Sequence, residues 1–349
     1  MSLTKPWHSI RPRRFPISFR VDRRMPAVLT ALVLVALGAL VLNLSQGEYP
    51  IPPLEVIKTL LGVPANADYT FVIHTLRLPR ALVALLVGVG LAVAGAILQG
   101  ITRNPLAAPE IIGINSGANL IAVAIIVLLP GISTMWLPIA AFAGGLGAAI
   151  AIYLLAWNGG SSPVRLILVG IGLTAMTAAL TSLMVTFGEI NAVSQALVWL
   201  TGSIYGRGWE HLRALLPWVG VFLPLSLLLA RDLDTLSLGD GLAQGLGSPV
   251  ERHRSLLLLC AVALAGSSVA TAGAVGFVGL MAPHLGRQLV GPSHAGLLPV
   301  SALLGACIVE LADLAGRLVF APIELPCGVI TAIIGAPYFL WLLYRDSTR

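Results

Sequence analysis

Long runs of apolar residues alternate with short polar turns along almost the whole chain. The apolar runs fall near residues 26–44, 81–101, 115–129, 136–157, 164–187, 212–230, 255–275, 276–290, 297–318 and 326–344. Most of them approach the ~20 residues that an α-helix needs to cross the hydrocarbon core of a bilayer. The pattern predicts an all-α polytopic membrane protein of about ten transmembrane helices, forming one domain over residues 26–345. The run at 276–290 is the weakest, because it is short and interrupted at Pro283.

The run from Ala81 to Ile101 has the clearest internal pattern. Small residues recur at every fourth position within it, namely Gly88, Ala92, Ala96 and Gly100. A helix face of small side chains lets a neighbouring helix approach closely in lipid. The stripe therefore predicts a helix-packing seam and is not evidence for a pore.

The composition supports this fold class and narrows the function. Of the 349 residues, 57% are hydrophobic and 10% are charged, against ~25% charged in an ordinary globular protein. Lys5 and Lys58 are the only lysines and neither follows a glycine, so the chain has no G-K-[ST] phosphate loop. If ATP drives this protein, ATP and Mg²⁺ bind a partner ATPase, and no cofactor is expected in this chain.

The residues that carry chemistry in enzymes and metal centres form no recognisable pattern here. Cys260, Cys307 and Cys327 lie far apart in apolar runs and fit no zinc-ligand spacing. We expect them to be small buried hydrophobic residues. No nucleophile and base converge at a common membrane depth, so a membrane enzyme ranks below a transporter. We predict no catalytic, cofactor-binding or metal-binding residues.

The distribution of positive charge predicts the orientation in the membrane. Residues 1–25 carry seven of the 21 lysines and arginines, and with the N-terminus inside, 15 of the 21 fall on the cytoplasmic side. This asymmetry follows the positive-inside rule, and it explains the net charge of +6 better than nucleic-acid binding does. Both termini are predicted to be cytoplasmic, with a basic tail over 1–25. The first apolar run exceeds the roughly 7–15 residues of a signal-peptide core, so we expect an uncleaved span.

Two long connections are predicted to lie outside the membrane, at 47–76 and 188–211. The second contains charged and amide side chains around a short apolar piece, residues 196–205. It is predicted to be an outer-surface helix with Trp199, Tyr205 and Trp209 at the depth of the lipid headgroups, where Trp and Tyr are enriched.

The longest internal connection is predicted at residues 231–254. Within it, Asp240 to Leu246 is expected to form a short helix ended by Gly247. Ser248 to Glu251 then has the form of a capping box before the next span. The segment is either a solvated connector or a rigid docking element, and the closely spaced helix start and stop signals favour the second interpretation.

Several motifs along the chain resemble those of one known family. They are Arg77-Leu78-Pro79-Arg80, Gln99, Arg103-Asn104-Pro105-Leu106-Ala107, Gly113, Gly239-Asp240 with Ala243 and Leu246-Gly247, Pro283-His284 with Arg287, Ala312-Asp313 with Arg317, and Glu324-Leu325-Pro326 with Gly328-Val329. These resemble the permease subunits of bacterial ABC importers for iron–siderophores and vitamin B12, the FecCD family. Leu200-Thr201-Gly202-Ser203 and Arg231-Asp232-Leu233-Asp234 look most like a permease of the iron(III)-dicitrate importer.

The resemblance implies a type II importer permease of ten helices, like that of the B12 importer, in the bacterial cytoplasmic (inner) membrane. It implies that two permeases, identical or homologous, pair around a central path, as a heterodimer in the iron–citrate case. Two cytoplasmic ATPase subunits and a periplasmic or lipid-anchored substrate-binding protein would complete the importer. The implied cargo is a ferric chelate, either a siderophore or iron(III) dicitrate.

Three arginines at the outer ends of spans acquire a candidate role from the resemblance. In the family, the arginines matching Arg77, Arg80 and Arg317 meet acidic residues of the binding protein, and a planar guanidinium holds a carboxylate through two hydrogen bonds. The alternative is interfacial snorkelling, which also places long cations at helix ends. Arg317 has a further candidate partner in Asp313, one helical turn earlier.

Two further groups of residues are candidates for roles in transport. The resemblance assigns the first, and helix periodicity indicates the second. The family places its ATPase-coupling helix at Gly239, Asp240, Ala243, Leu246 and Gly247. In the run at 164–187, Thr174, Ala178 and Ser182 continue a small-residue stripe that begins at Gly170. This stripe is interpreted either as lining the translocation pathway or as ordinary helix packing.

Two remaining titratable residues stand out. Glu310 lies inside the run at 297–318, where a carboxyl group is costly and often functional. Together with Asp313 it supports an alternative function, an ion-coupled secondary transporter. His284 lacks companions at metal-ligand spacing, so packing or a terminal hydrogen bond is the preferred interpretation.

Overall fold

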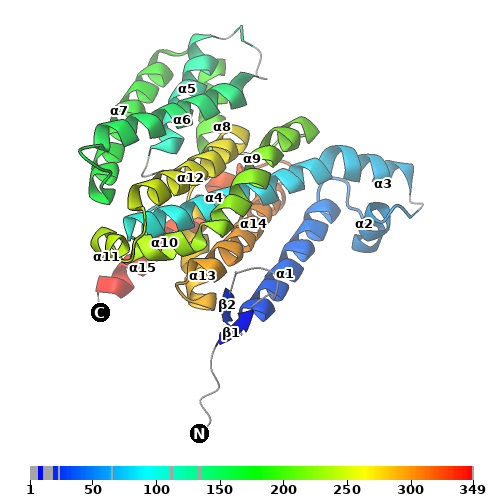
Figure 1. Cartoon of the computed structure of the whole chain (residues 1–349). Helices are drawn as coiled ribbons and strands as arrows, with labels where there is room; N and C mark the ends of the chain where they lie inside the picture. The colour runs from blue at the N-terminus through cyan, green and yellow to red at the C-terminus, as the bar shows by residue number, and fades with distance from the viewer. Residues whose placement is uncertain are drawn as a thin grey trace.

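The computed structural model describes residues 7–10, 19–22, 24–63, 66–110, 113–129, 131–132 and 136–347 (Figure 1). It is a bundle of helices preceded by a short β-hairpin. In the hairpin, β1 (Trp7–Ile10) pairs antiparallel with β2 (Phe19–Asp22). The other residues of the predicted basic tail up to residue 23 lie outside the described part of the chain.

Each of the ten predicted spans contains a helix, which confirms the fold class. The ten are α1 (Met25–Ser45), α4 (Leu78–Thr102), α5 (Ile114–Leu128), α6 (Leu137–Ala156), α7 (Pro163–Phe187), α9 (Trp209–Leu228), α12 (Val250–Ala272), α13 (Val278–Val290), α14 (His294–Leu318) and α15 (Cys327–Ser347). Within the described residues, eight of these helices are long and apolar enough to cross a membrane. The other two, α5 and α13, have 15 and 13 residues.

The core of the bundle is built around α4, which packs against α12, α13 and α14 (Figure 1). Every residue of α4 from Val87 to Thr102 is buried, as expected for a helix that is apolar on all sides. A Cβ atom added to Gly88 would collide with the backbone carbonyl of Gly305 on α14, and one added to Gly95 would collide with Gly279 on α13. The predicted packing seam is confirmed, because only glycine allows these backbones to approach so closely.

The short helices between the spans lie at two opposite ends of the bundle. In Figure 1, α10 (Ala230–Ser237) and α11 (Asp240–Gly245) lie toward the lower left, on the same side as the start of α1 and the end of α15. The opposite end carries α2 (Pro53–Leu60) and α3 (Ala67–Phe71). The two ends match the inner and outer sides that the charge distribution predicts.

The predicted outer loops contain more helix than the sequence pattern indicated. Residues 47–76 include α2, α3 and most of η1 (Val72–Arg77), a π-helical segment that continues into α4, so that residues 67–102 are helical without a break. A π-helical turn just before Pro79 lets the chain pass a residue that lacks an N–H without ending the helix. In the second loop, the surface helix is α8 (Ile190–Thr201), which starts earlier than the predicted apolar piece.

Two predictions about the ends of α12 are wrong in detail. The span predicted at 255–275 ends at Ala272. Gly273 and Phe277 both adopt positive φ, which interrupts the helix between α12 and α13. The predicted capping box is also absent. The N-cap of α12 is Pro249, and the Glu251 carboxylate accepts hydrogen bonds from Ser161 of the α6–α7 turn.

Candidate functional site

At the outer end, Arg77 and Arg317 fasten the C-terminus of α1. Arg77 Nη1 donates to Leu44 O at 2.7 Å and Nη2 to Tyr49 O at 2.6 Å. Arg317 Nη2 donates to Asn43 Oδ1 at 2.6 Å. The last carbonyls of a helix have no partner inside it, so cationic donors stabilise them. Both arginine side chains are buried and point inward.

Arg80 lies beside them and forms the strongest charge pair of this end. Its Nη2 lies 2.9 Å from Asp313 Oδ1 on α14 and 2.9 Å from Glu324 Oε2, just before α15. Arg317 Nε lies 3.6 Å from the other oxygen of Asp313, which confirms the predicted one-turn pair. Asp313 is therefore shared by two arginines, and its side chain is only 3% exposed.

The three predicted docking arginines thus come together at one end of the bundle, but each already has internal partners. Snorkelling does not describe them either, because their guanidinium groups bind carbonyls and carboxylates of the chain. Docking to an acidic partner stays a prediction, and Arg80 is the member best placed for it because its side chain is 14% exposed and its partner Glu324 33%.

At the inner end, the predicted short helix is confirmed as α11. Ala243 is fully buried and anchors the helix, whereas Leu242 and Leu246 are 65% and 69% exposed. Gly247 follows at a φ of 80°, the left-handed conformation that ends many helices. Two large apolar side chains four positions apart therefore project from the same side of the inner end, which is how a helix presents itself to a groove on a partner.

The base under α11 is rigid because Arg254 ties it to two other elements. Arg254, 1% exposed, donates from Nη2 to Asp240 Oδ1 at 2.5 Å and from Nη1 to Ser161 O at 2.6 Å. Gly239, which precedes α11, has a φ of 104°, and a Cβ there would lie 3.0 Å from Arg103 Nη1. These contacts favour the rigid docking element over the solvated connector.

A second tie holds α10, an element that the sequence pattern missed. Asp234 Oδ1 accepts from the backbone N of His294 at 2.9 Å and lies 2.6 Å from His294 Nδ1, so it caps the start of α14. On the other side of α10, Leu233 and Leu236 are buried. Their spacing of three was the available signal for a helix in this segment.

The stripe on α7 divides into a packed and an exposed part. Gly170 is buried, and Thr174 Oγ1 lies 3.1 Å from Ser116 Oγ of α5. Ala178 and Ser182 are exposed on the surface of the single chain. Packing therefore explains the first half of the stripe, while the second half is free for either a partner helix or a pathway.

Glu310 and His284 differ in the contacts that the fold provides to their polar side-chain atoms. The Glu310 side chain is fully buried, and neither carboxylate oxygen has a hydrogen-bond partner among the described residues. His284 Nε2 lies 2.9 Å from Gln288 Nε2, and its ring meets Tyr338 edge-on. In the described part of the chain, no three His, Cys, Asp or Glu side chains gather at a spacing that would hold a metal ion.

Comparison with known proteins identifies the family. The FecCD transport family matches residues 32–345. The chain belongs to this family. It is 46% identical to the probable siderophore transport system permease protein YfhA of Bacillus subtilis (strain 168), over 90% of this chain and 94% of that protein. It is 44% identical to the Fe(3+) dicitrate transport system permease protein FecD of Escherichia coli (strain K12), over 91% and 98%.

A solved structure, described as a metal-chelate type ABC transporter in an inward-facing conformation, has the same fold. It superposes with a TM-score of 0.82 at 34% identity and covers 92% of this chain and 99% of its own. As a FecCD family member, the chain is a multi-pass inner-membrane permease of the ABC-importer type and is not itself an enzyme. Such a permease works with ATPase and substrate-binding partners.

Sequence reasoning assigned no role to three residues that shape these sites. Asn43 binds Arg317, Glu324, known only as part of a family motif, binds Arg80, and Arg254 supports α11. Asn43 was visible as a lone amide near the end of an apolar run. Arg254 was visible only as a charge, because its partners are far from it in the sequence.

Proposed function

We propose that this chain is the transmembrane permease subunit of an ABC importer that moves a ferric chelate, a siderophore or iron(III) dicitrate, across the cytoplasmic membrane. The relatives described above carry siderophore and Fe(3+) dicitrate in their names. A second permease, homologous and forming a heterodimer or identical, pairs with it. Two ATPase subunits bind below, and a periplasmic or lipid-anchored binding protein docks above.

The observation that carries this proposal is α11 on its rigid base. Leu242 and Leu246 project from a helix whose other side is fixed by Ala243 and by the Asp240–Arg254 ion pair. A movement of the ATPases that pushes on these leucines passes to α12 and to the α6–α7 turn, because Arg254 of α12 binds both Asp240 of α11 and Ser161 of that turn. Gly239 and Gly247 lie just before and just after α11, the helix that transmits the motion.

At the outer end, Arg80 changes one of its partners when the binding protein docks. An acidic side chain of the binding protein replaces Glu324 at the guanidinium, while Asp313 stays bound to it. Arg77 and Arg317 hold α1 in position around this contact. This division of roles follows from their burial and from their carbonyl partners.

The exposed half of the α7 stripe faces the partner permease or the pathway. Ala178 and Ser182 offer small, weakly polar surface, and Thr174 continues the same face into the bundle. Such a surface lets a hydrophilic chelate pass without tight binding. Helix-to-helix packing against the second permease is the other use of the same face.

Two measurements test the proposal. Co-purification of the chain with its partners, followed by subunit mass determination, shows whether the second permease is identical or homologous. Uptake of radiolabelled iron into cells, supplied with citrate, hydroxamate and catecholate chelators in turn, identifies the cargo. Uptake that is independent of the chain for every ferric chelate would contradict the proposal.

A further inference from the structure

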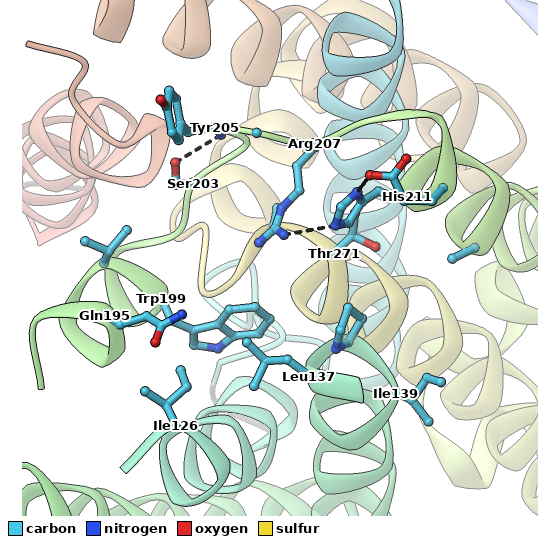
Figure 2. Close-up of a pocket in the computed structure, with 16 residues that line it drawn as sticks. Ile126, Leu137, Ile139, Gln195, Trp199, Ser203, Tyr205, Arg207, His211 and Thr271 are labelled. Atoms are coloured by element: carbon cyan, nitrogen blue, oxygen red, sulfur yellow. Dashed lines mark hydrogen bonds and ion pairs between the residues drawn. The ribbon is translucent and has the colours of Figure 1, made fainter. Parts of the chain in front are cut away.

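A cleft of about 690 Å³ lies at the outer end of the bundle. It adjoins the arginine cluster, since the ring of Tyr205, which lines it, lies 5.8 Å from Arg80 Cζ. It is bounded by the outer ends of α5 and α6, by α8, by the loop at 202–208 and by the start of α9 (Figure 2). Its size falls within the ~300–1,000 Å³ that is usual for small-molecule sites. The transport role described above makes no use of it.

The Arg207 guanidinium stands in this cleft and makes no direct ion pair with any described residue. Among the described residues, no carboxylate lies within 4 Å of the Arg207 guanidinium nitrogens; the nearest acid, Glu210, pairs instead with His211 Nδ1 at 3.0 Å. Arg207 Nη1 lies 3.1 Å from His211 Nε2, which accepts the bond because a guanidinium only donates. Burial lowers the pKa of Arg207, and the nearby Glu210 carboxylate offsets only part of this effect.

Two buried N–H donors that face the cleft lack an acceptor in the described part of the chain. Arg207 Nε and the Trp199 indole Nε1 are both buried, and neither has an acceptor within the described structure. The guanidinium also stands 5.9 Å above the Trp199 ring. Figure 2 shows the two side chains facing one another across the cleft. Buried donors normally have partners, so an oxygen-rich anion would complete this wall.

The opposite wall is apolar and opens outward. Ile126, Leu137 and Pro138 line it, and Ile139 and Val198 line it while remaining 61% and 54% exposed. Tyr205 lies in the loop that bounds the cleft and Trp209 lies at the start of α9. Trp and Tyr are enriched at the headgroup depth of a bilayer. A ligand here meets a cation at one end and hydrocarbon at the other.

We propose that this cleft binds an anionic phospholipid of the outer leaflet, with the headgroup phosphate on Arg207 and an acyl chain leaving over Ile139 and Val198. Guanidinium groups hold phosphate through paired, charge-assisted hydrogen bonds. The bound lipid joins the α5–α6 hairpin to the loop that precedes α9. Glu210, directed to solvent and paired with His211, does not occupy the phosphate position.

The test uses the full-length chain, purified with its partner subunits from nanodiscs of equal phosphatidylglycerol and phosphatidylcholine, and native mass spectrometry of the lipids that stay bound. We expect phosphatidylglycerol to be retained selectively. Arg207→Gln should weaken its retention about tenfold, the usual scale for one charge-assisted contact. Ala214→Phe should do the same by filling the cleft while leaving the charge in place. Arg213→Gln removes an exposed charge of α9, the helix that begins two residues after Arg207, and should leave lipid retention unchanged.

A second arm separates a lipid from a soluble anion. Inorganic phosphate and citrate are titrated by calorimetry against the complex in nanodiscs of phosphatidylcholine alone. Binding of either anion that Arg207→Gln abolishes, without selective lipid retention, would overturn the lipid assignment. Equal phosphatidylglycerol retention by the Arg207→Gln and Arg213→Gln proteins would overturn it as well. Arg207→Lys should keep part of the retention, since it preserves the charge without the planar fork.

Discussion

Arg80 and Asp313 form a two-pronged ion pair across the seam between α4 and α14. Arg80 Nε donates to both carboxylate oxygens at 3.2 Å, and Nη2 donates to Oδ1 at 2.9 Å. Because Arg317 approaches the same carboxylate, Asp313 neutralises two cations that also hold α1 and α15 in place. The charged groups at the outer end are thus paired with one another. An acidic side chain of a partner protein can bind Arg80 only by displacing one of its internal carboxylates.

Asp313→Asn should destabilise the folded chain strongly. Removing one partner of a buried ion pair costs about 3–5 kcal/mol, and Arg80 keeps Glu324, so we expect a loss of free energy of unfolding near ~3 kcal/mol. Equilibrium unfolding in mixed detergent micelles measures it. The control is Glu55→Gln, which breaks the exposed Glu55–Lys58 pair and should cost less than ~1 kcal/mol. Equal losses for the two variants would refute the shared role of Asp313.

Glu324→Gln should tighten the complex with the binding protein. The substitution removes an internal competitor for Arg80, whose guanidinium then offers a free prong to a partner carboxylate. We expect the dissociation constant to fall severalfold, while Arg80→Gln raises it about tenfold or more. Surface plasmon resonance on the reconstituted transporter measures both. If neither variant changes the affinity, Arg80 does not contact the binding protein.

Leu242→Ala combined with Leu246→Ala should uncouple the ATPase from transport. Both side chains are exposed on α11, so their loss leaves the fold intact and removes apolar contact with the partner, worth roughly 2 kcal/mol for each fully buried leucine. Pull-down of the ATPase and ATP-dependent uptake should both decline at least tenfold. Leu238→Ala, at an exposed leucine just before α11, serves as the matched control. Normal assembly and transport in the double variant would exclude α11 as the coupling helix.

Cysteines along α7 distinguish a pathway from packing. Cysteine at Ser182 should react with a water-soluble thiol reagent in at least one nucleotide state, whereas cysteine at the buried Thr181 next to it should not. The native cysteines are all buried, so the background is low. Protection of Ser182→Cys in every nucleotide state would assign this face of α7 to helix packing.

Whether a structural feature could be predicted from the sequence depends on how far apart along the chain its interacting residues lie. Hydrophobic runs and the four-residue stripe of α4 are local patterns, so the spans and the existence of a packing seam follow from them, but not the identity of α14 as the partner helix. Asp240 to Gly247 carries local start and stop signals, so α11 was also predictable. The Asp313–Arg317 pair is local and was predicted, but Arg80–Asp313 and Arg254–Ser161 join residues far apart in sequence, and such pairs cannot be read from one sequence.

The errors have the same origin. The connection at 47–76 was predicted only as an external loop with a short amphipathic piece around Leu54 to Leu61, and that piece is α2, with Pro53 at its first position. Ser248 and Glu251 have capping-box spacing, but Ser161, about ninety positions away, provides the better partner for the carboxylate. The break between α12 and α13 depends on positive φ at Phe277, which an apolar sequence does not announce.

The central claim is that an ATP-driven partner moves iron through this chain, and transport in proteoliposomes tests it most directly. The chain is reconstituted with its partner permease, ATPase and binding protein, and accumulation of radiolabelled ferric citrate is followed. The account predicts uptake that requires internal ATP, persists when ionophores collapse the proton and sodium gradients, and is lost with the Leu242 and Leu246 double variant. Uptake that proceeds without ATP and stops with the ionophores would contradict it and assign Glu310 and Asp313 to ion coupling instead.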